Sequence, residues 1–324
     1  MATRDTAIGG NVEAIDLKIE VGGGIVKASI YSLAIFTNLT DLRVRKCSLE
    51  YVPEDIGDLS NLTHLDFAKN DIRWLPPSVT KLVNLKNVDV RNNLIFELPP
   101  MIGNCGKLEE LRLDHNKLYD LPQSMIEMPI LKKVTLDRNM FQILTGWLDE
   151  LEHLKTLTFS YNEVDKLPST FHLMGTTLTE LRCTYNKLTQ VSTMFTGLVR
   201  LKILDLTGNP IKTVPKHMGA LEDLEELYVN YCSLETMDIH LAECRKVRDF
   251  LVWLFRLFRV VMFRHAPVSS GTRFFWACAH VVRCCRRYIA CCAKLHALSP
   301  FEYGSLTVVG FVSFIPSNMK AMTL

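Results

Sequence analysis

The stretch that decides the fold runs from Leu85 to Gly103 and reads Leu-Lys-Asn-Val-Asp-Val-Arg-Asn-Asn-Leu-Ile-Phe-Glu-Leu-Pro-Pro-Met-Ile-Gly. Apolar and polar residues alternate at Val88 and Val90, which predicts a short strand with one buried face. Asn93 and then Leu-Pro follow this strand. Because proline fixes φ and lacks a backbone donor, the chain is expected to turn back there.

The same pattern occurs nine times, in steps of 23 residues with a single step of 24. Its ninth position is asparagine in seven copies and cysteine in the first and last, Cys47 and Cys232. No copy can bury its own apolar face, so the copies must stack with their strands in parallel. We therefore expect an α/β solenoid, a horseshoe with a parallel concave sheet. The copies begin at Leu39, Leu62, Leu85, Leu108, Leu131, Leu154, Leu178, Leu201 and Leu224.

The ninth-position asparagine should be buried and should hydrogen-bond backbone groups of the adjoining turns. Both ends of such an array need a cap. Counting back 23 residues from Leu42 and Val44 gives Ile19 and Val21, which predicts a degenerate first repeat. The expected organisation is a flexible N-terminus (1–14), a cap repeat (15–38), nine repeats (39–246), a degenerate cap (247–252) and a tail (253–324).

The repeat resembles the 23-residue class of intracellular leucine-rich repeat proteins, which includes Scribble, Erbin, Densin and Ras suppressor protein. The resemblance covers roughly residues 15–252. It implies a scaffold or adaptor that works in intracellular signalling by binding a protein partner. The alternative is a soluble regulatory subunit of a signalling enzyme such as a phosphatase or a small GTPase.

A partner would meet the strand residues that are not leucine, because these face the concave side. In the second half of the array they are rich in tyrosine, and tyrosine and arginine are enriched at binding hot spots. We predict a partner-binding patch on neighbouring strands about 5 Å apart. The alternative is a solvated face on which the tyrosines stack on one another. The patch consists of Tyr161, Arg182, Tyr185, Tyr228 and Tyr231.

Charged residues occupy the same positions in the first half of the array. They predict either a second interface or a solvated face. Their mixed signs argue against a nucleic-acid partner, because a surface that follows phosphates should be uniformly basic. They are Arg43, Asp66, Asp89, Arg91, Arg112 and Asp114.

No motif in the chain predicts catalysis. The sequence has no phosphate-binding Gly-x-x-x-x-Gly-Lys loop, no Gly-x-Ser-x-Gly elbow and no His-Glu-x-x-His. Asp114, Asp137 and Arg138 fall on adjacent strands, where we expect salt-bridged surface. We therefore expect a protein that is not an enzyme and that takes no cofactor, metal or small-molecule substrate.

Charge divides the 324 residues unevenly, although the net charge is only +2. Up to Cys244 there are 25 Lys+Arg and 33 Asp+Glu, and from Arg245 there are 12 and 2. An acidic body thus carries a basic, apolar tail. Its segment from Phe250 to Arg264 is too short and too charged to span a bilayer, and we expect a helix that lies on an anionic membrane surface. The alternative is that the first turns of this segment cap the solenoid.

Five cysteines share one face of a second helix expected between Phe274 and Leu298. Cysteines among basic residues on an amphipathic helix are typical of S-acylation. The alternatives are a metal site that adds His280 and His296, or a poorly specified tail. The N-terminus has no apolar core of signal-peptide length, so we expect reduced thiols and a cytoplasmic, peripheral membrane protein. The lipidation candidates are Cys278, Cys284, Cys285, Cys291 and Cys292.

Overall fold

The computed structural model describes residues 14–18, 37–191, 193–214 and 216–237. The chain divides into two units, residues 1–265 and 266–324, and the second lies wholly outside the described residues. The predicted cap at 247–252, the two tail helices and the five candidate lipidation cysteines also lie outside them. Among the described residues, no helix combines the length and the hydropathy that crossing a membrane requires.

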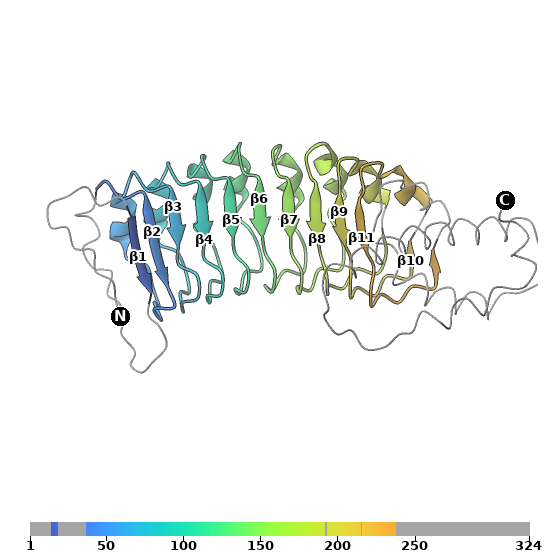
Figure 1. The fold of residues 1–324 in the computed structure, drawn as a ribbon, viewed down its shortest axis with the longest axis horizontal. Coiled ribbons are helices and arrows are strands. Elements are labelled where there is room, and N and C mark those ends of the chain that lie inside the picture. The colour runs from blue at the N-terminus through green and yellow to red at the C-terminus, as the bar shows by residue number, and fades with distance from the viewer. Residues whose placement is uncertain (1–13, 19–36, 192, 215, 238–324) are drawn as a thin grey trace, which may run out of the picture. The chain divides into compact units, whose positions relative to one another are not determined.

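Ten parallel strands among the described residues form one sheet, and strands that follow one another along the repeats lie side by side in it (Figure 1). A parallel solenoid is what the repeat pattern predicts, so the expected fold is confirmed. The strands are β1 (Ala14–Lys18), β2 (Asp41–Arg45), β3 (His64–Asp66), β4 (Asn87–Asp89), β5 (Glu110–Arg112), β6 (Lys133–Thr135), β7 (Thr156–Thr158), β8 (Glu180–Arg182), β9 (Ile203–Asp205) and β11 (Glu226–Tyr228).

The register of the sheet follows the sequence repeat from β2 onward. Leu65 of β3 pairs with Leu42 on one side and with Val88 on the other, so equivalent residues stand opposite each other. These residues are buried, and the residue before each of them is half-buried, whereas Asp66 and Asp89, which follow Leu65 and Val88, are only 9 % exposed. Alternation therefore gives each strand one core face and one outer face.

Strand β1 corrects the predicted register of the first repeat. Ile15 pairs with Leu42 and Leu17 pairs with Val44, so the equivalent residues are 27 apart rather than 23. The prediction placed Ile19 and Val21 opposite them and was wrong by four residues. The reason is that the connection from β1 to β2 is four residues longer than in the regular repeats, and a constant step cannot detect this.

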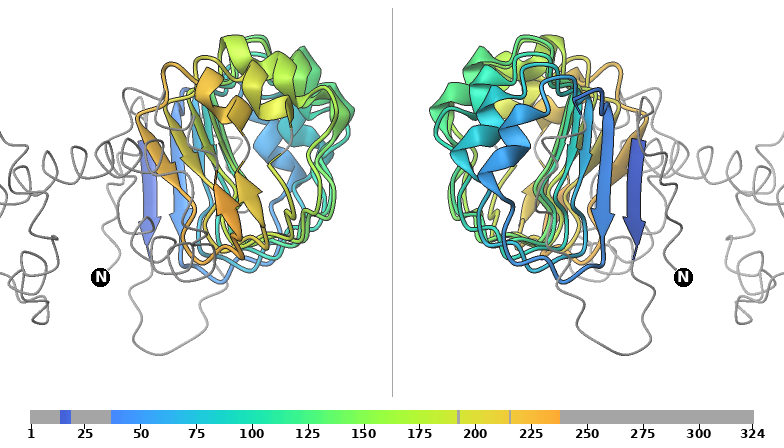
Figure 2. Two further views of the ribbon diagram at one scale, coloured as in Figure 1. Left: turned by 90° about the vertical axis from the view of Figure 1, so that its right-hand side faces the viewer. Right: turned by 90° about the vertical axis from the view of Figure 1, so that its left-hand side faces the viewer.

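The connections return along the opposite side of the core from the sheet through short 3-10 helices rather than α-helices (Figure 2). Pro53 precedes one of them with φ −70°, and the amide of Ile56 donates to its carbonyl at 3.2 Å. A 23-residue repeat leaves room for one such turn, in which Ile56 is fully buried. The helices are η2 (Glu54–Asp58), η3 (Pro77–Lys81), η4 (Ile102–Asn104), η5 (Gln123–Glu127), η6 (Gly146–Glu150), η7 (Phe171–Thr176), η8 (Thr193–Gly197) and η9 (Lys216–Ala220).

A second, much shorter parallel pairing occurs at the thirteenth residue of the repeat, just after the turn that follows each strand of the main sheet. Strands β10 (Thr213–Val214) and β12 (Thr236–Met237) pair there, and Trp74 and Glu97 form an isolated bridge at the equivalent place.

The ninth-position asparagines form the buried ladder that the sequence predicts. The amide nitrogen of Asn93 donates to the carbonyls of Phe67 and Val90, each at 2.9 Å, and its oxygen accepts from the amide of Ile72 at 3.0 Å. One side chain thus joins two repeats. In the last repeat the thiol of Cys232 donates to the carbonyl of Leu206 at 3.4 Å, the place of an asparagine nitrogen.

Candidate functional site

The candidate site lies on the sheet face, meaning the solvent-facing side chains of the strands together with the rim formed by the eighth residue of each repeat. Every rim residue from the first to the ninth repeat has positive φ. For residues other than glycine, this left-handed conformation costs roughly 1–2 kcal/mol. The backbone turn at the end of each strand requires it and directs the rim side chains outward. The rim residues are Lys46, Lys69, Asn92, His115, Arg138, Tyr161, Tyr185, Gly208 and Tyr231.

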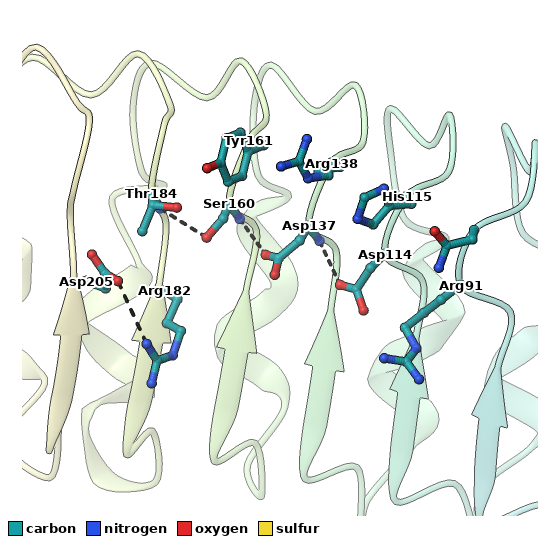
Figure 3. Close-up of a pocket in the computed structure, with 11 residues that line it drawn as sticks. Arg91, Asp114, His115, Asp137, Arg138, Ser160, Tyr161, Arg182, Thr184 and Asp205 are labelled. Carbon is teal, nitrogen blue, oxygen red and sulfur yellow. Dashed lines mark hydrogen bonds and ion pairs between the residues drawn. The ribbon is translucent and has the colours of Figure 1, made fainter. Parts of the chain in front are cut away.

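Three rim side chains stack on one another. The rings of Tyr161 and Tyr185 have centroids 4.6 Å apart and are inclined by 16°. The Cζ atom of Arg138 lies 4.1 Å from the centroid of the Tyr161 ring, on the side of the preceding repeat (Figure 3). The spacing of parallel strands, about 4.8 Å, is what makes stacking possible between equivalent residues of successive repeats. Arginine over a tyrosine face adds a cation–π contact.

Gly208 follows Tyr185 on the rim and ends the stack of side chains. Its φ is +76°, and a Cβ atom there would lie 2.6 Å from Cδ1 of the Tyr185 ring. The ring therefore leans over the glycine. Tyr231, the next rim residue, is 74 % exposed.

The other two residues of the predicted patch lie lower, on the strands. The Nε of Arg182 bonds to Glu180 at 2.6 Å, and its Nη1 lies 3.8 Å from Asp205. The hydroxyl of Tyr228 donates to Glu226 at 3.1 Å. The structure thus brings Tyr161 and Tyr185 together, and it holds Arg182 and Tyr228 against acidic neighbours on the same strands.

The third position of each repeat also lies on the sheet face, although the candidate patch predicted from sequence does not include it. Glu180 and Glu226 stand there, two residues before the predicted patch residues, and both are half-buried on the sheet face. The period of two along a strand was the signal that could have found them, because residues two apart share a face.

Asp114, Asp137 and Ser160 form a ladder rather than the expected salt-bridged surface. The amide of Asp137 donates to Oδ1 of Asp114 at 2.9 Å, and the amide of Ser160 donates to Oδ1 of Asp137 at 2.6 Å. The amide of Thr184 continues the ladder to Oγ of Ser160 at 3.1 Å (Figure 3). Each side chain thus satisfies the seventh-position amide of the next repeat, just beyond the strand. This is a structural role.

Other repeats satisfy the same amide with the aspartate two residues earlier. The amides of Ala68, Arg91 and Thr207 donate to Oδ1 of their own fifth-position aspartate at 3.0, 3.2 and 3.1 Å. The repeats served by the ladder have Thr135, Thr158 and Arg182 at the fifth position. Their amides therefore need the carboxylate or hydroxyl of the preceding repeat.

Burial raises the pKa of Asp137 above its ordinary value of 3.8, and the nearby charge of Asp114 raises it further, while the hydrogen bond from the Ser160 amide acts in the opposite direction. A neighbouring carboxylate on a partly desolvated face disfavours the charged form of Asp137.

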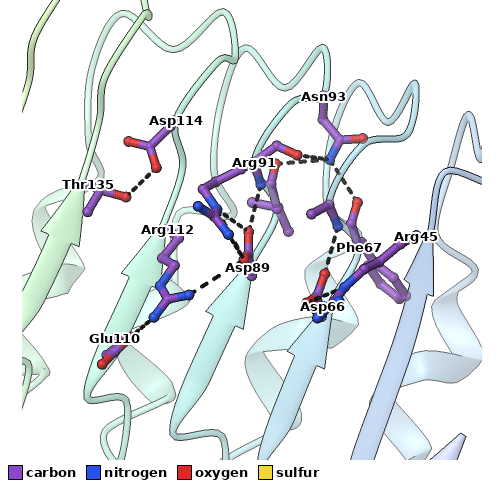
Figure 4. Close-up of polar contacts among 12 residues, drawn as sticks. Arg45, Asp66, Phe67, Asp89, Arg91, Asn93, Glu110, Arg112, Asp114 and Thr135 are labelled. Carbon is purple, nitrogen blue, oxygen red and sulfur yellow. Dashed lines mark hydrogen bonds and ion pairs between the residues drawn. The ribbon is translucent and has the colours of Figure 1, made fainter. Parts of the chain in front are cut away.

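The charged half of the sheet face is largely paired with itself (Figure 4). Both Nε and Nη2 of Arg91 donate to the carboxylate of Asp89, and Nη2 lies 2.7 Å from Oδ2. Arg112 bonds to Glu110 at 2.6 Å, and Arg45 pairs with Asp66. Exposed pairs of this kind contribute little to stability. Because their charges already have partners, they favour the interpretation as a solvated face over that as a second interface.

A shallow hollow of about 390 Å³ lies on the sheet face between the charged and the aromatic halves. The hollow is lined by Arg91, Asn92, Asp114, His115, Asp137, Arg138, Ser160, Tyr161, Arg182, Thr184 and Asp205.

Within the described ranges, no three His, Cys, Asp or Glu side chains come together as a metal site would require. Burial raises the pKa of the Cys105 thiol to about 11 and raises that of Cys183 as well. Both thiols are therefore protonated near neutral pH, and neither suits a nucleophile.

Comparison with family models matches two parts of the chain. Residues 20–136 match a model described as a leucine-rich repeat region, and residues 176–234 match a leucine rich repeat model. A search of curated proteins found no match.

Solved structures show the same fold. A leucine-rich repeat protein of Leptospira interrogans is 27 % identical with a TM-score of 0.65, over 67 % of this chain and 55 % of that one. An internalin of Listeria monocytogenes is 21 % identical with a TM-score of 0.61, over 68 % and 62 %. TLR13, solved in complex with ssRNA13, is 27 % identical with a TM-score of 0.53, over 60 % and 29 %. The chain thus spans less than two thirds of each of these structures.

Proposed function

Because this chain is a leucine-rich repeat protein, we propose that it is a non-enzymatic interaction module that binds a protein partner on its sheet face. Leucine-rich repeats commonly present an extended surface to other proteins. The finer proposal is an intracellular adaptor in signalling, as the resemblance to Scribble and its relatives implies.

The stack of Arg138, Tyr161 and Tyr185 is the observation that carries this proposal. Tyr161 and Tyr185 are each 42 % exposed although they are held by their neighbours. Side chains that are already ordered lose less conformational entropy on binding, and tyrosine offers both an apolar ring and a hydroxyl. The rest of the proposed patch consists of Arg182 on β8, in the same repeat as Tyr185, and of Tyr228 and Tyr231, which are both in the last described repeat.

The variant Tyr161→Asn/Tyr185→Asn tests the proposal. Asparagine tolerates positive φ and already occupies the rim at Asn92, so the turns should persist while both rings are lost. The matched control is Tyr119→Asn, since Tyr119 is 60 % exposed and lies outside the rim. Interaction partners of the intact chain are quantified for wild type and both variants.

We expect the double variant to lose at least one partner that the control retains, with unchanged circular dichroism. An identical set of partners for all three proteins would overturn the proposal.

The tail is proposed to recruit the protein to a membrane. The support is the sequence alone: a basic tail follows an acidic body, and it contains Cys278, Cys284, Cys285, Cys291 and Cys292. Several acyl chains next to basic residues anchor a protein firmly, whereas one chain does not.

Fractionation of the intact chain tests this part separately. The wild type should pellet with membranes and be released by hydroxylamine, while a variant with all five cysteines replaced by serine should stay in the supernatant. Equal partition of both proteins would contradict acylation as the anchor.

A further inference from the structure

An apolar row of exposed side chains crosses the first five repeats at the twelfth and thirteenth positions of the repeat. These positions follow the asparagine turn and lie between the buried eleventh residue and the buried fourteenth residue. Each of the five repeats contributes one large side chain that is between 40 and 69 % exposed. The apolar row consists of Tyr51, Trp74, Phe96, Tyr119 and Ile143.

Backbone hydrogen bonds hold these segments of successive repeats side by side. From the second to the fifth repeat, the tenth-position amide donates to the eleventh-position carbonyl of the preceding repeat at 2.8 or 2.9 Å. The amide of Phe96 donates to the carbonyl of Arg73 at 3.3 Å, and Trp74 and Glu97 form a parallel bridge. With about 4.8 Å between paired segments, the apolar row is about 19 Å long.

The fold does not require apolar side chains at these two positions. In the sixth to ninth repeats both positions are polar, and Thr213 of β10 pairs there with Thr236 of β12 (Figure 1). Exposed apolar side chains that adjoin one another over several repeats mark an interaction surface. The apolar row is therefore a candidate docking surface, separate from the sheet face.

The charge beside the apolar row is mainly acidic. Asp71, Glu97 and Asp120 take part in none of the ion pairs among the described residues. An occupant that is both apolar and basic fits this surface, whereas an anionic lipid surface is repelled by it. At the tenth, twelfth and thirteenth positions of the first five repeats, the exposed acidic residues are Glu50, Asp71, Glu97 and Asp120, and the exposed basic residues are Arg73 and Lys117.

We propose that the apolar row is the docking surface for residues 250–264 of the same chain, a segment that lies outside the described residues. Its side chains are apolar except for Arg256, Arg259 and Arg264, so it complements both the row and the carboxylates beside it. As the helix expected from its sequence, this segment of 15 residues would be about 22 Å long, which matches the length of the row.

The connection to this segment is long enough. The described residues end at 237 in the ninth repeat, and the 12 residues 238–249 come before the segment. Fully extended, they span about 40 Å. The fifth repeat, where the row ends, is about 19 Å away along the array, and the first repeat is about 38 Å away. The segment can therefore begin at either end of the row.

Photo-crosslinking within the intact chain tests the docking surface. p-Benzoylphenylalanine replaces Trp74 in one sample and Leu173 in the control, because Leu173 is also exposed but lies on η7, outside the row. Tryptic peptides are identified by mass spectrometry. Each sample is a mixture of ¹⁵N-labelled and unlabelled chains, so that a crosslink between two copies shows both isotopes. We expect position 74, and not 173, to crosslink to residues 250–264 of the same chain.

Charge variants test the complementarity. Arg256→Glu/Arg259→Glu should lower the yield of this crosslink about two- to ten-fold, because exposed ion pairs are individually weak. Adding Asp71→Lys/Glu97→Lys to that variant should restore the yield. The control Arg286→Glu/Arg287→Glu changes the charge of the tail equally but outside the segment, and should leave the yield unchanged.

Three results would each overturn this docking surface: no crosslink from position 74 to residues 250–264, an equal yield from position 173, or crosslinks that all join two copies. An equal loss of yield in both arginine variants would overturn the charge complementarity. The inference does not rest on the proposed function, which fails separately by unchanged partners in Tyr161→Asn/Tyr185→Asn.

Discussion

Replacing Asn162 by alanine should destabilise the protein by removing hydrogen bonds between two neighbouring repeats. The amide nitrogen of Asn162 donates to the carbonyls of Leu136 and Phe159 at 3.0 and 2.9 Å, and its oxygen accepts from the amide of Phe141 at 3.1 Å. The side chain is 7 % exposed, so water cannot replace it freely. The Phe141 amide loses this partner, whereas the carbonyls of Leu136 and Phe159 still accept from Asn139 and Asn186, so the loss of stability is about 2–4 kcal/mol.

Two further variants calibrate this value. Asn162→Cys should be about 1 kcal/mol less destabilising than alanine, because a thiol can keep one donor contact, as Cys232 does at the equivalent position. Asn84→Ala removes a donor to the carbonyl of Ser60 at 2.9 Å, but this bond is exposed and its loss should cost less than about 0.5 kcal/mol.

Urea denaturation of the intact chain, followed by circular dichroism, gives the free energy of unfolding of each variant. Hydrogen exchange should show the Phe141 amide as newly labile in Asn162→Ala. If Asn162→Ala cost less than about 1 kcal/mol, or no more than Asn84→Ala, the argument that the asparagine ladder joins the repeats would be refuted.

Three other changes test separate features. Lys69→Gly should stabilise the protein by about 1 kcal/mol in urea denaturation, because Lys69 has φ 62° and glycine adopts that conformation without strain. Gly103→Ala should destabilise the protein by about 2–3 kcal/mol, because the new Cβ would lie 1.9 Å from a carbonyl oxygen of the next repeat. The control Gly146→Ala, whose new Cβ would have no atom within 4 Å, should stay within about 0.5 kcal/mol of wild type. Asp137→Asn should gain stability over wild type as pH rises from 3 toward 6, because the raised pKa of Asp137 makes its ionisation costlier in the folded chain; a constant difference across that range would contradict this.

The solenoid could be predicted because the sequence repeats the same buried strand residues and the same asparagine at a fixed interval. Alternation at positions such as Val88 and Val90 specifies the buried strand face, and Asn93 specifies the buried turn. Each copy must bury its face against the next, so one motif fixes the whole sheet. The register of β1 could not be predicted, because its connection to β2 departs from that interval.

The site was predicted less completely, since the side-chain partners depend on neighbours in other repeats. Tyr161 and Tyr185 were expected on adjacent strands, but sequence alone left open whether they stack. Gly208 matters only because the Tyr185 ring leans over it. In the sequence, Asp137 is indistinguishable from an ordinary surface charge. Its carboxylate accepts from the Ser160 amide only because the repeats of β6 and β7 lie side by side.

Photo-crosslinking measures most directly whether the aromatic rim meets a protein partner. p-Benzoylphenylalanine is placed at Tyr231 on the rim in one sample and at Tyr119 in another; both side chains are exposed. We expect a protein crosslinked from position 231 and not from 119, and loss of that product when Tyr161→Asn/Tyr185→Asn is added. A partner crosslinked from position 119 and not from 231 would contradict it.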